Sequence, residues 1–144
     1  MKPLPSLLLL ATVGCATAFA GDAPPTRKPL PYAQCIQTDR INEWHIVDKR
    51  TAVVRTGPYR YAVHLKADCP RLGIGVPGFL LHASESGKVA GEGRICGGLG
   101  ETVSARDQPP CAISSVELID KASFERMRKH AARHGSGAEL PPSR

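Results

Sequence analysis

The sequence predicts a mainly β domain, a small antiparallel barrel or sandwich held by disulfides and followed by one C-terminal α-helix. Three observations support this class of fold. Short segments rich in Val, Ile, Tyr and Thr recur between turns, at a spacing of roughly 8–12 residues. Four cysteines follow the N-terminal segment, and the apolar period changes from two to three or four after Ile119.

Residues 1–20 have the features of a secretion signal peptide. Lys2 supplies a positive start, residues 7–18 form an uncharged apolar run, and Ala18-Phe19-Ala20 is a small-x-small cleavage motif. The run is shorter than the roughly 20 residues that span a bilayer. We therefore expect cleavage after Ala20, no transmembrane span in the mature protein, and a location in the periplasm or outside the cell.

An alternative N-terminal processing centres on Cys15. Thr12-Val13-Gly14-Cys15 resembles a lipobox, although Thr12 stands where a large aliphatic residue is usual. Acyl chains on Cys15 would anchor the protein to a membrane. Cleavage after Ala20 is the favoured reading, and a membrane-anchored lipoprotein is the alternative.

Four cysteines lie beyond the signal segment: Cys35, Cys69, Cys96 and Cys111. An even number in a short exported chain predicts two disulfides. No C-x-x-C pair is present, which argues against a zinc knuckle and against a thioredoxin-like motif. Four cysteines allow three pairings. A barrel topology favours Cys35–Cys111, joining the ends of the sheet, and Cys69–Cys96, clamping its middle.

The chain divides into one domain with extended ends. Residues 21–32 form a Pro-rich leader, 33–120 the disulfide-stapled β domain, 121–134 a basic helix, and 135–144 a disordered tail. Strands are expected over residues 40–48, 51–55, 59–66, 79–83, 94–96, 101–105 and 111–119, with a polar hairpin tip at 84–88. The clearest alternation covers residues 59–66, which predicts one face on the core and one in water.

The C-terminal helix is expected to have Ser123 as N-cap, to run to about His134 with Gly135 as its stop, and to pack loosely. Phe124, Met127 and Ala131 give it one narrow apolar stripe.

Positive charge is concentrated in this helix. The chain carries 19 Lys and Arg against 13 Asp and Glu, a net charge of +6. One interpretation is a solvated helix face. The functional interpretation is a contact through Arg126, Lys129 and Arg133 with an anionic envelope surface, or with another envelope protein. Nucleic acid is not expected as a partner, because no binding motif is recognisable and only 5% of residues are aromatic.

No catalytic signature stands out. There is no G-x-S-x-G motif, and the paired cysteines leave no free thiol. His45, His64 and His82 fall on three expected strands, which would suit a zinc site, but are interpreted as solvated or edge histidines. His130 and His134 have the spacing of a metal pair on one helical turn, but they also suit the negative end of the helix dipole, and metal binding is not expected there. The glycines around Cys96 are interpreted as tight turns. The sequence thus predicts no catalytic residue, no metal ligand and no cofactor.

A series of short motifs resembles a known family. It comprises Cys35-Ile36, Asp39-Arg40-Ile41, Asp48-x-Arg50-Thr51, Tyr61-x-Val63-x-Leu65, Cys69-Pro70-x-Leu72, Arg94-Ile95-Cys96 and Cys111-x-Ile113-x-x-Val116. Their order and spacing resemble a family of small exported proteobacterial proteins classed as a domain of unknown function. The likeness spans roughly residues 35–118 and leaves the basic helix outside. It implies an envelope location, often as a lipoprotein, and implies no activity.

Two functions from different classes follow from these observations. The favoured one is a non-enzymatic binding or structural role in the cell envelope. The alternative is a small periplasmic hydrolase or metal-dependent enzyme.

Overall fold

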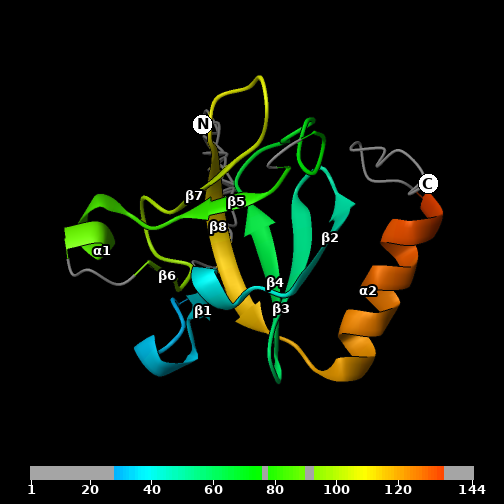
Figure 1. Ribbon diagram of the computed structural model, residues 1–144, viewed down its shortest axis with the longest axis horizontal. Coiled ribbons are helices and arrows are strands. Elements are labelled where there is room, and N and C mark those ends of the chain that lie inside the picture. Colours follow the sequence, from blue (N-terminus) through cyan, green and yellow to red (C-terminus); the bar gives the residue numbers. More distant parts are fainter. Residues whose placement is uncertain (1–27, 76–77, 90–92, 135–144) are drawn as a thin grey trace, which may run out of the picture.

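The structure is a computed structural model that describes residues 28–75, 78–89 and 93–134, with side chains up to Ala131 (Figure 1). The expected signal segment with Cys15, most of the leader and the tail from residue 135 onward lie outside the described residues. Within these residues, none of the helices is long and apolar enough to cross a membrane.

A curled antiparallel sheet of six strands forms the body of the protein, and its shape is a half-barrel. The strand order is β2-β3-β4-β8-β7-β5. The strands are β2 (Glu43–Asp48), β3 (Thr51–Thr56), β4 (Tyr59–Leu65), β5 (Leu80–His82), β7 (Thr102–Ser104) and β8 (Cys111–Leu118). The predicted class, mainly β with disulfides and a C-terminal helix, is confirmed.

A small second sheet lies beside the half-barrel. It pairs β1 (Ile36–Gln37) with β6 (Arg94–Ile95), and short 3-10 helices at Tyr32–Gln34 and Thr38–Arg40 flank β1. The sequence did not reveal β1, because two residues are too few to show a period.

The expected hairpin tip at 84–88 is wrong, since this segment forms the short helix α1 (Glu85–Val89). The reason is local. The Ser84 hydroxyl accepts a hydrogen bond from the backbone N–H of Gly87 at 3.1 Å, which is a helix-capping geometry.

The inner face of the sheet carries the main core. Its most deeply buried members include Ile36, Val54, Val63, Ile95 and Val103. The β1–β6 sheet contributes two of them, so it acts as a lid on the concave side. Trp44 on edge strand β2 stacks on Phe79, just before edge strand β5, with ring centroids 5.5 Å apart. Aromatic packing therefore links the two edges where backbone pairing stops.

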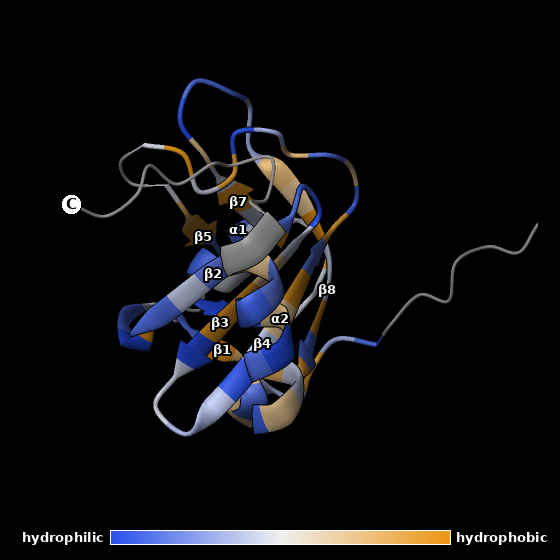
Figure 2. Cartoon of the chain, turned by 90° about the vertical axis from the view of Figure 1, so that its right-hand side faces the viewer, coloured by the Kyte–Doolittle hydropathy of each residue, from blue (hydrophilic) through white to orange (hydrophobic). Residues whose placement is uncertain are grey.

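The outer face is covered by helix α2 (Lys121–His134), which packs against β2, β3 and β4 (Figure 2). The expectation that this face lies in water is wrong. Val47 and Val53 point outward from the sheet and pack with Phe124, which is only 1% exposed. Phe124 and Met127 pack the helix against the sheet, as their apolar stripe predicted. Because Phe124 is almost completely buried, the helix packs more tightly than expected.

Asp120, not Ser123, caps the start of α2. Its Oδ1 accepts a hydrogen bond from the backbone N–H of Ser123 at 2.6 Å. Asp120 is favoured because it directly precedes the first helical residue, Lys121, which is the N-cap position.

All four cysteines form disulfides, as predicted, but the pairing is Cys35–Cys96 and Cys69–Cys111. The expected pairing was wrong because it ignored β1. In the β1–β6 ladder Ile36 lies opposite Ile95, which brings Cys35 and Cys96 together. The second pair follows from β4 and β8.

In the ladder between β4 and β8, Leu65 lies opposite Ile113, and the Lys66 N–H donates to the Ala112 carbonyl at 2.9 Å. Cys69, just beyond β4, therefore meets Cys111 at the start of β8.

Candidate functional site

The outward face of α2 is the most strongly charged surface that the sequence singled out. Lys121, Arg126 and Lys129 are exposed there. The Arg126 guanidinium donates to the Ser123 hydroxyl at 2.9 Å, which holds it close to its own helix. The side chain of Arg133, the third predicted contact residue, lies outside the described part of the chain. Two of the three predicted residues thus share one solvent-facing surface.

The acidic residue of α2, Glu125, forms an ion pair with Arg128 on the same helix. Glu125 Oε2 accepts hydrogen bonds from Arg128 Nη2 at 2.7 Å and from Arg128 Nε at 3.1 Å. This bond holds the pKa of the Glu125 carboxyl below its usual value, so Glu125 stays ionised and is matched by Arg128. The charges of Lys121, Arg126 and Lys129 are not neutralised by it.

Beneath α2, a cluster of ionisable groups surrounds the small apolar contact. Glu43 on β2 lies 2.8 Å from His45 Nε2 and 2.9 Å from Arg55 Nε on β3. The hydrogen bond with His45, together with the electrostatic attraction of His45, Arg55 and Arg128, lowers the pKa of the Glu43 carboxyl, while burial acts the other way. Glu43 is therefore anionic, and it attracts both Arg55 of the sheet and Arg128 of helix α2.

A shallow hollow of about 570 Å³ lies at the β2–β3 turn, lined by Asp48, Lys49, Arg50, Thr51, His64, Leu65 and Asp68. Arg50 Nε lies 2.6 Å from Asp68 Oδ1, and Asp48 Oδ1 accepts the Arg50 backbone N–H at 2.7 Å. His64, another lining residue, has its Nε2 2.8 Å from Oε1 of Glu117 on β8. Within the lining, Arg50 is thus matched by Asp68.

The hollow is the nearest approach in the described residues to the enzymatic alternative. A His–carboxylate pair can accept or donate a proton. His64 lies opposite Thr51 in the β3–β4 ladder, so a hydroxyl is also present. Among the residues with described positions, however, no group of three His, Cys, Asp or Glu is arranged to hold a metal ion. His45, His64 and His82 are therefore not brought into one metal site, and His45 and His64 each pair with a glutamate.

Glu101 is a buried carboxylate that sequence reasoning missed. It is 5% exposed, and its two oxygens accept the backbone N–H groups of Cys96 at 2.8 Å and Gly97 at 2.7 Å. Burial raises the pKa of the Glu101 carboxyl, and the N–H groups of Cys96, Gly97 and Gly98 oppose that rise. Its role is structural, because it closes the turn that carries the Cys35–Cys96 disulfide.

Gly97 explains why this turn is rich in glycine. Its φ is +86°, and a Cβ there would lie 2.7 Å from the Val116 backbone nitrogen. A side chain has no space at that position. The interpretation of the glycines around Cys96 as tight turns is consistent with this geometry. Glu101 directly follows this glycine-rich segment in the sequence, and that position was the one feature from which its role could have been predicted.

Fold and surface together define a small, disulfide-stapled β half-barrel with a basic helix on its outer face. The chain belongs to a family of unknown function, DUF6491, whose model matches residues 2–135. The match includes α2, so the expectation that the likeness ends before the basic helix is wrong. No curated protein and no solved structure matches the chain.

Proposed function

We propose that this protein is an exported, non-enzymatic component of the cell envelope that binds an anionic surface through the outward face of α2. The observation that carries the proposal is the exposure of Lys121, Arg126 and Lys129 on one helix whose only acidic residue, Glu125, is bonded to Arg128. A fixed array of cations attracts phosphate, carboxylate or sulfate groups without needing a pocket.

Export is supported by two independent features. Residues 1–20 have the order of charge, apolar run and cleavage motif that signal peptides use. Two disulfides join the four remaining cysteines, and such bonds persist in oxidising compartments. The proposed location is the periplasm or the exterior, with cleavage after Ala20 or, alternatively, lipidation of Cys15. Mass spectrometry of protein isolated from its native envelope distinguishes these, and an intact chain that begins at Met1 would contradict both.

The strength of the contact can be estimated from the number of cations. Each Lys or Arg near an anionic lipid surface contributes about 1 kcal/mol, and screening confines the attraction to about 8 Å at physiological salt. Removal of two charges should therefore weaken binding about 30-fold.

The test compares the wild type with Arg126→Gln/Lys129→Gln. Both proteins are titrated against vesicles containing phosphatidylglycerol and against an immobilised sulfated polysaccharide, at several salt concentrations. We expect the variant to bind at least one of these probes about 30-fold more weakly than the wild type, and the wild-type affinity to fall as salt rises. Removal of the whole helix is a poorer test, because it would uncover Val47 and Val53.

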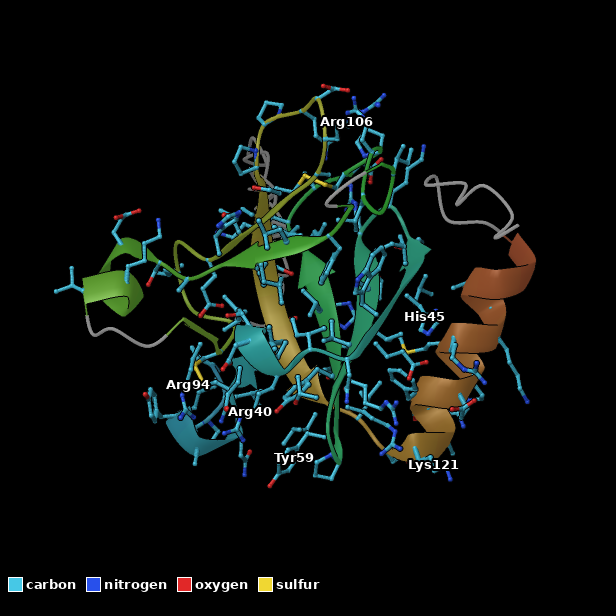
Figure 3. The ribbon with its side chains drawn as sticks, viewed as in Figure 1. Arg40, His45, Tyr59, Arg94, Arg106 and Lys121 are labelled. Atoms are coloured by element: carbon cyan, nitrogen blue, oxygen red, sulfur yellow. A yellow bond between two sulfur atoms is a disulfide. The ribbon has the colours of Figure 1, made fainter. Side chains whose placement is uncertain are left out.

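A matched control removes the same charge elsewhere. Lys66→Gln/Arg106→Gln neutralises two exposed cations in loops. Figure 3 shows Arg106 at the opposite end of the molecule from Lys121, and the Lys66 backbone bonds to Ala112 near the start of β8, the end of that strand away from Leu118. We expect this control to bind as the wild type does. The proposal fails if the wild type binds neither probe, or if both double variants lose affinity equally, since net charge alone would then explain the binding.

A further inference from the structure

Three large apolar side chains are exposed at one end of the half-barrel, although they come from different parts of the chain. Tyr32 and Tyr59 are each 52% exposed, and Leu118 is 37% exposed. Tyr59 begins β4, and Leu118 ends β8, opposite Tyr61 in the β4–β8 ladder. Tyr59 and Leu118 thus lie at the same end of the sheet, where β4 begins and β8 ends.

Cations surround these apolar side chains. The Arg94 guanidinium lies 4.3 Å from the centre of the Tyr32 ring and donates to the Tyr32 carbonyl at 3.2 Å. Arg40 and Lys121 are exposed, and Figure 3 shows Arg40, Arg94, Tyr59 and Lys121 along the same edge of the molecule. We refer to this surface as the tyrosine–arginine end, comprising Tyr32, Arg40, Tyr59, Arg94, Leu118 and Lys121.

Among the residues that the structure describes, two carboxylates also belong to the tyrosine–arginine end. Asp39 neighbours Arg40, and Asp120 is engaged by the backbone N–H of Ser123 at the start of α2. The described cations at this end are Arg40, Arg94 and Lys121, three side chains against these two carboxylates. The described part of this end is therefore partly apolar and carries more cationic than anionic side chains.

This combination has a specific physical use. Tyrosine has an apolar ring and a polar hydroxyl, and it is favoured where a membrane meets water. Arginine and lysine complement lipid phosphates. Binding to a bilayer surface increases with both buried apolar area and attraction to anionic lipids. An anionic polymer offers the charges but no apolar layer to receive the tyrosines.

We propose that the tyrosine–arginine end docks on an anionic lipid bilayer, with Tyr32 and Tyr59 at headgroup depth. This rests on the proposed function and deepens it by naming lipid as the anionic surface. The end and the outward face of α2 meet at Lys121, the first residue of the helix. A tilted molecule therefore brings both against one plane.

The first test uses the full-length oxidised protein and the same two probes. Tyr32→Ser/Tyr59→Ser removes both exposed rings. The matched control, Val89→Ser/Leu99→Ser, removes two side chains that are even more exposed, at 89% and 86%. We expect the tyrosine variant to bind phosphatidylglycerol vesicles about ten-fold more weakly and to bind the sulfated polysaccharide unchanged. The control should match the wild type on both probes.

The second test reports depth directly. The chain has a single tryptophan, Trp44, so Trp44→Phe/Tyr59→Trp places the only indole at the proposed contact. Addition of phosphatidylglycerol vesicles should shift its emission to the blue and protect it from an aqueous quencher. Circular dichroism verifies that each variant is folded.

The outcomes separate the two proposals. If the Tyr32→Ser/Tyr59→Ser variant binds vesicles as tightly as the wild type, or if the indole at position 59 stays accessible, the lipid-docking inference is wrong. The proposed function survives that result when Arg126→Gln/Lys129→Gln still weakens binding. If the two tyrosines instead control self-association, seen as a smaller sedimenting species in the tyrosine variant without lipid, the end is an interface between copies and the inference is equally overturned.

Discussion

The two faces of the sheet are covered in different ways, and the difference separates stability from surface chemistry. The inner face is packed by apolar side chains from most of the strands. The disulfides Cys35–Cys96 and Cys69–Cys111 crosslink the segments next to this core. The outer face is covered by a single helix through a small apolar cluster around Phe124, ringed by ionised groups. The inner face therefore defines the fold, and the outer face is where this fold presents charge.

Loss of a disulfide should have the largest effect, because it acts on the inner face. Cys69→Ala/Cys111→Ala opens a link between residues 42 apart in sequence. The unfolded chain regains conformational freedom, and the free energy of unfolding should fall by about 4 kcal/mol. Urea unfolding of the oxidised proteins measures this. A loss below about 1 kcal/mol would show that the inner face does not depend on this bond.

Phe124→Ala should have the next largest effect and tests the outer face. It removes the fully buried ring that packs on Val53 and should cost about 3 kcal/mol. Phe124→Leu keeps most of the volume and should cost less than half as much. If both substitutions leave urea unfolding unchanged, α2 is not docked on the sheet.

Glu101→Gln should destabilise the turn behind the Cys35–Cys96 disulfide by about 2 kcal/mol. The side-chain amide of glutamine accepts only through its oxygen, so either Cys96 or Gly97 loses the acceptor for its backbone N–H. Thermal unfolding of the oxidised variant gives the shift. An unchanged midpoint would mean that water replaces the lost acceptor.

Several of these elements could be predicted and others could not, for physical reasons. Alternation in residues 59–66 and the period change after Ile119 are local, so the strands and the helix were accessible from the sequence. The disulfide pairing was not, because it depends on the two-residue strand β1 finding β6. The burial of Val53 under Phe124 was missed for a related reason: alternation identifies two faces but not what covers the second one.

The surface residues show the same limit. The sequence located Arg126 and Lys129 on a helix, and their exposure agrees with that placement. It gave no sign that Tyr32, Tyr59 and Arg94 meet at one end, because they are far apart along the chain.

Glu43→Gln should have a small effect that depends on pH. The pKa of Glu43 is lowered in the folded protein, so the carboxylate stabilises the fold above its unfolded-state pKa, and this contribution is lost as pH falls through the lowered value. The difference in unfolding free energy between wild type and variant should be below about 1 kcal/mol at pH 7 and should vanish in acid. A difference that grows as pH falls would contradict the assigned direction.

The division between the two faces is tested most directly by measuring stability and binding on the same variant, Arg126→Gln/Lys129→Gln. Both side chains are exposed, so the free energy of unfolding in urea should stay within about 0.5 kcal/mol of the wild type. In the same preparation, affinity for at least one anionic probe, phosphatidylglycerol vesicles or the sulfated polysaccharide, should fall about 30-fold. A variant that unfolds more easily yet binds both probes as tightly as the wild type would show that these cations serve the fold and not an anionic surface.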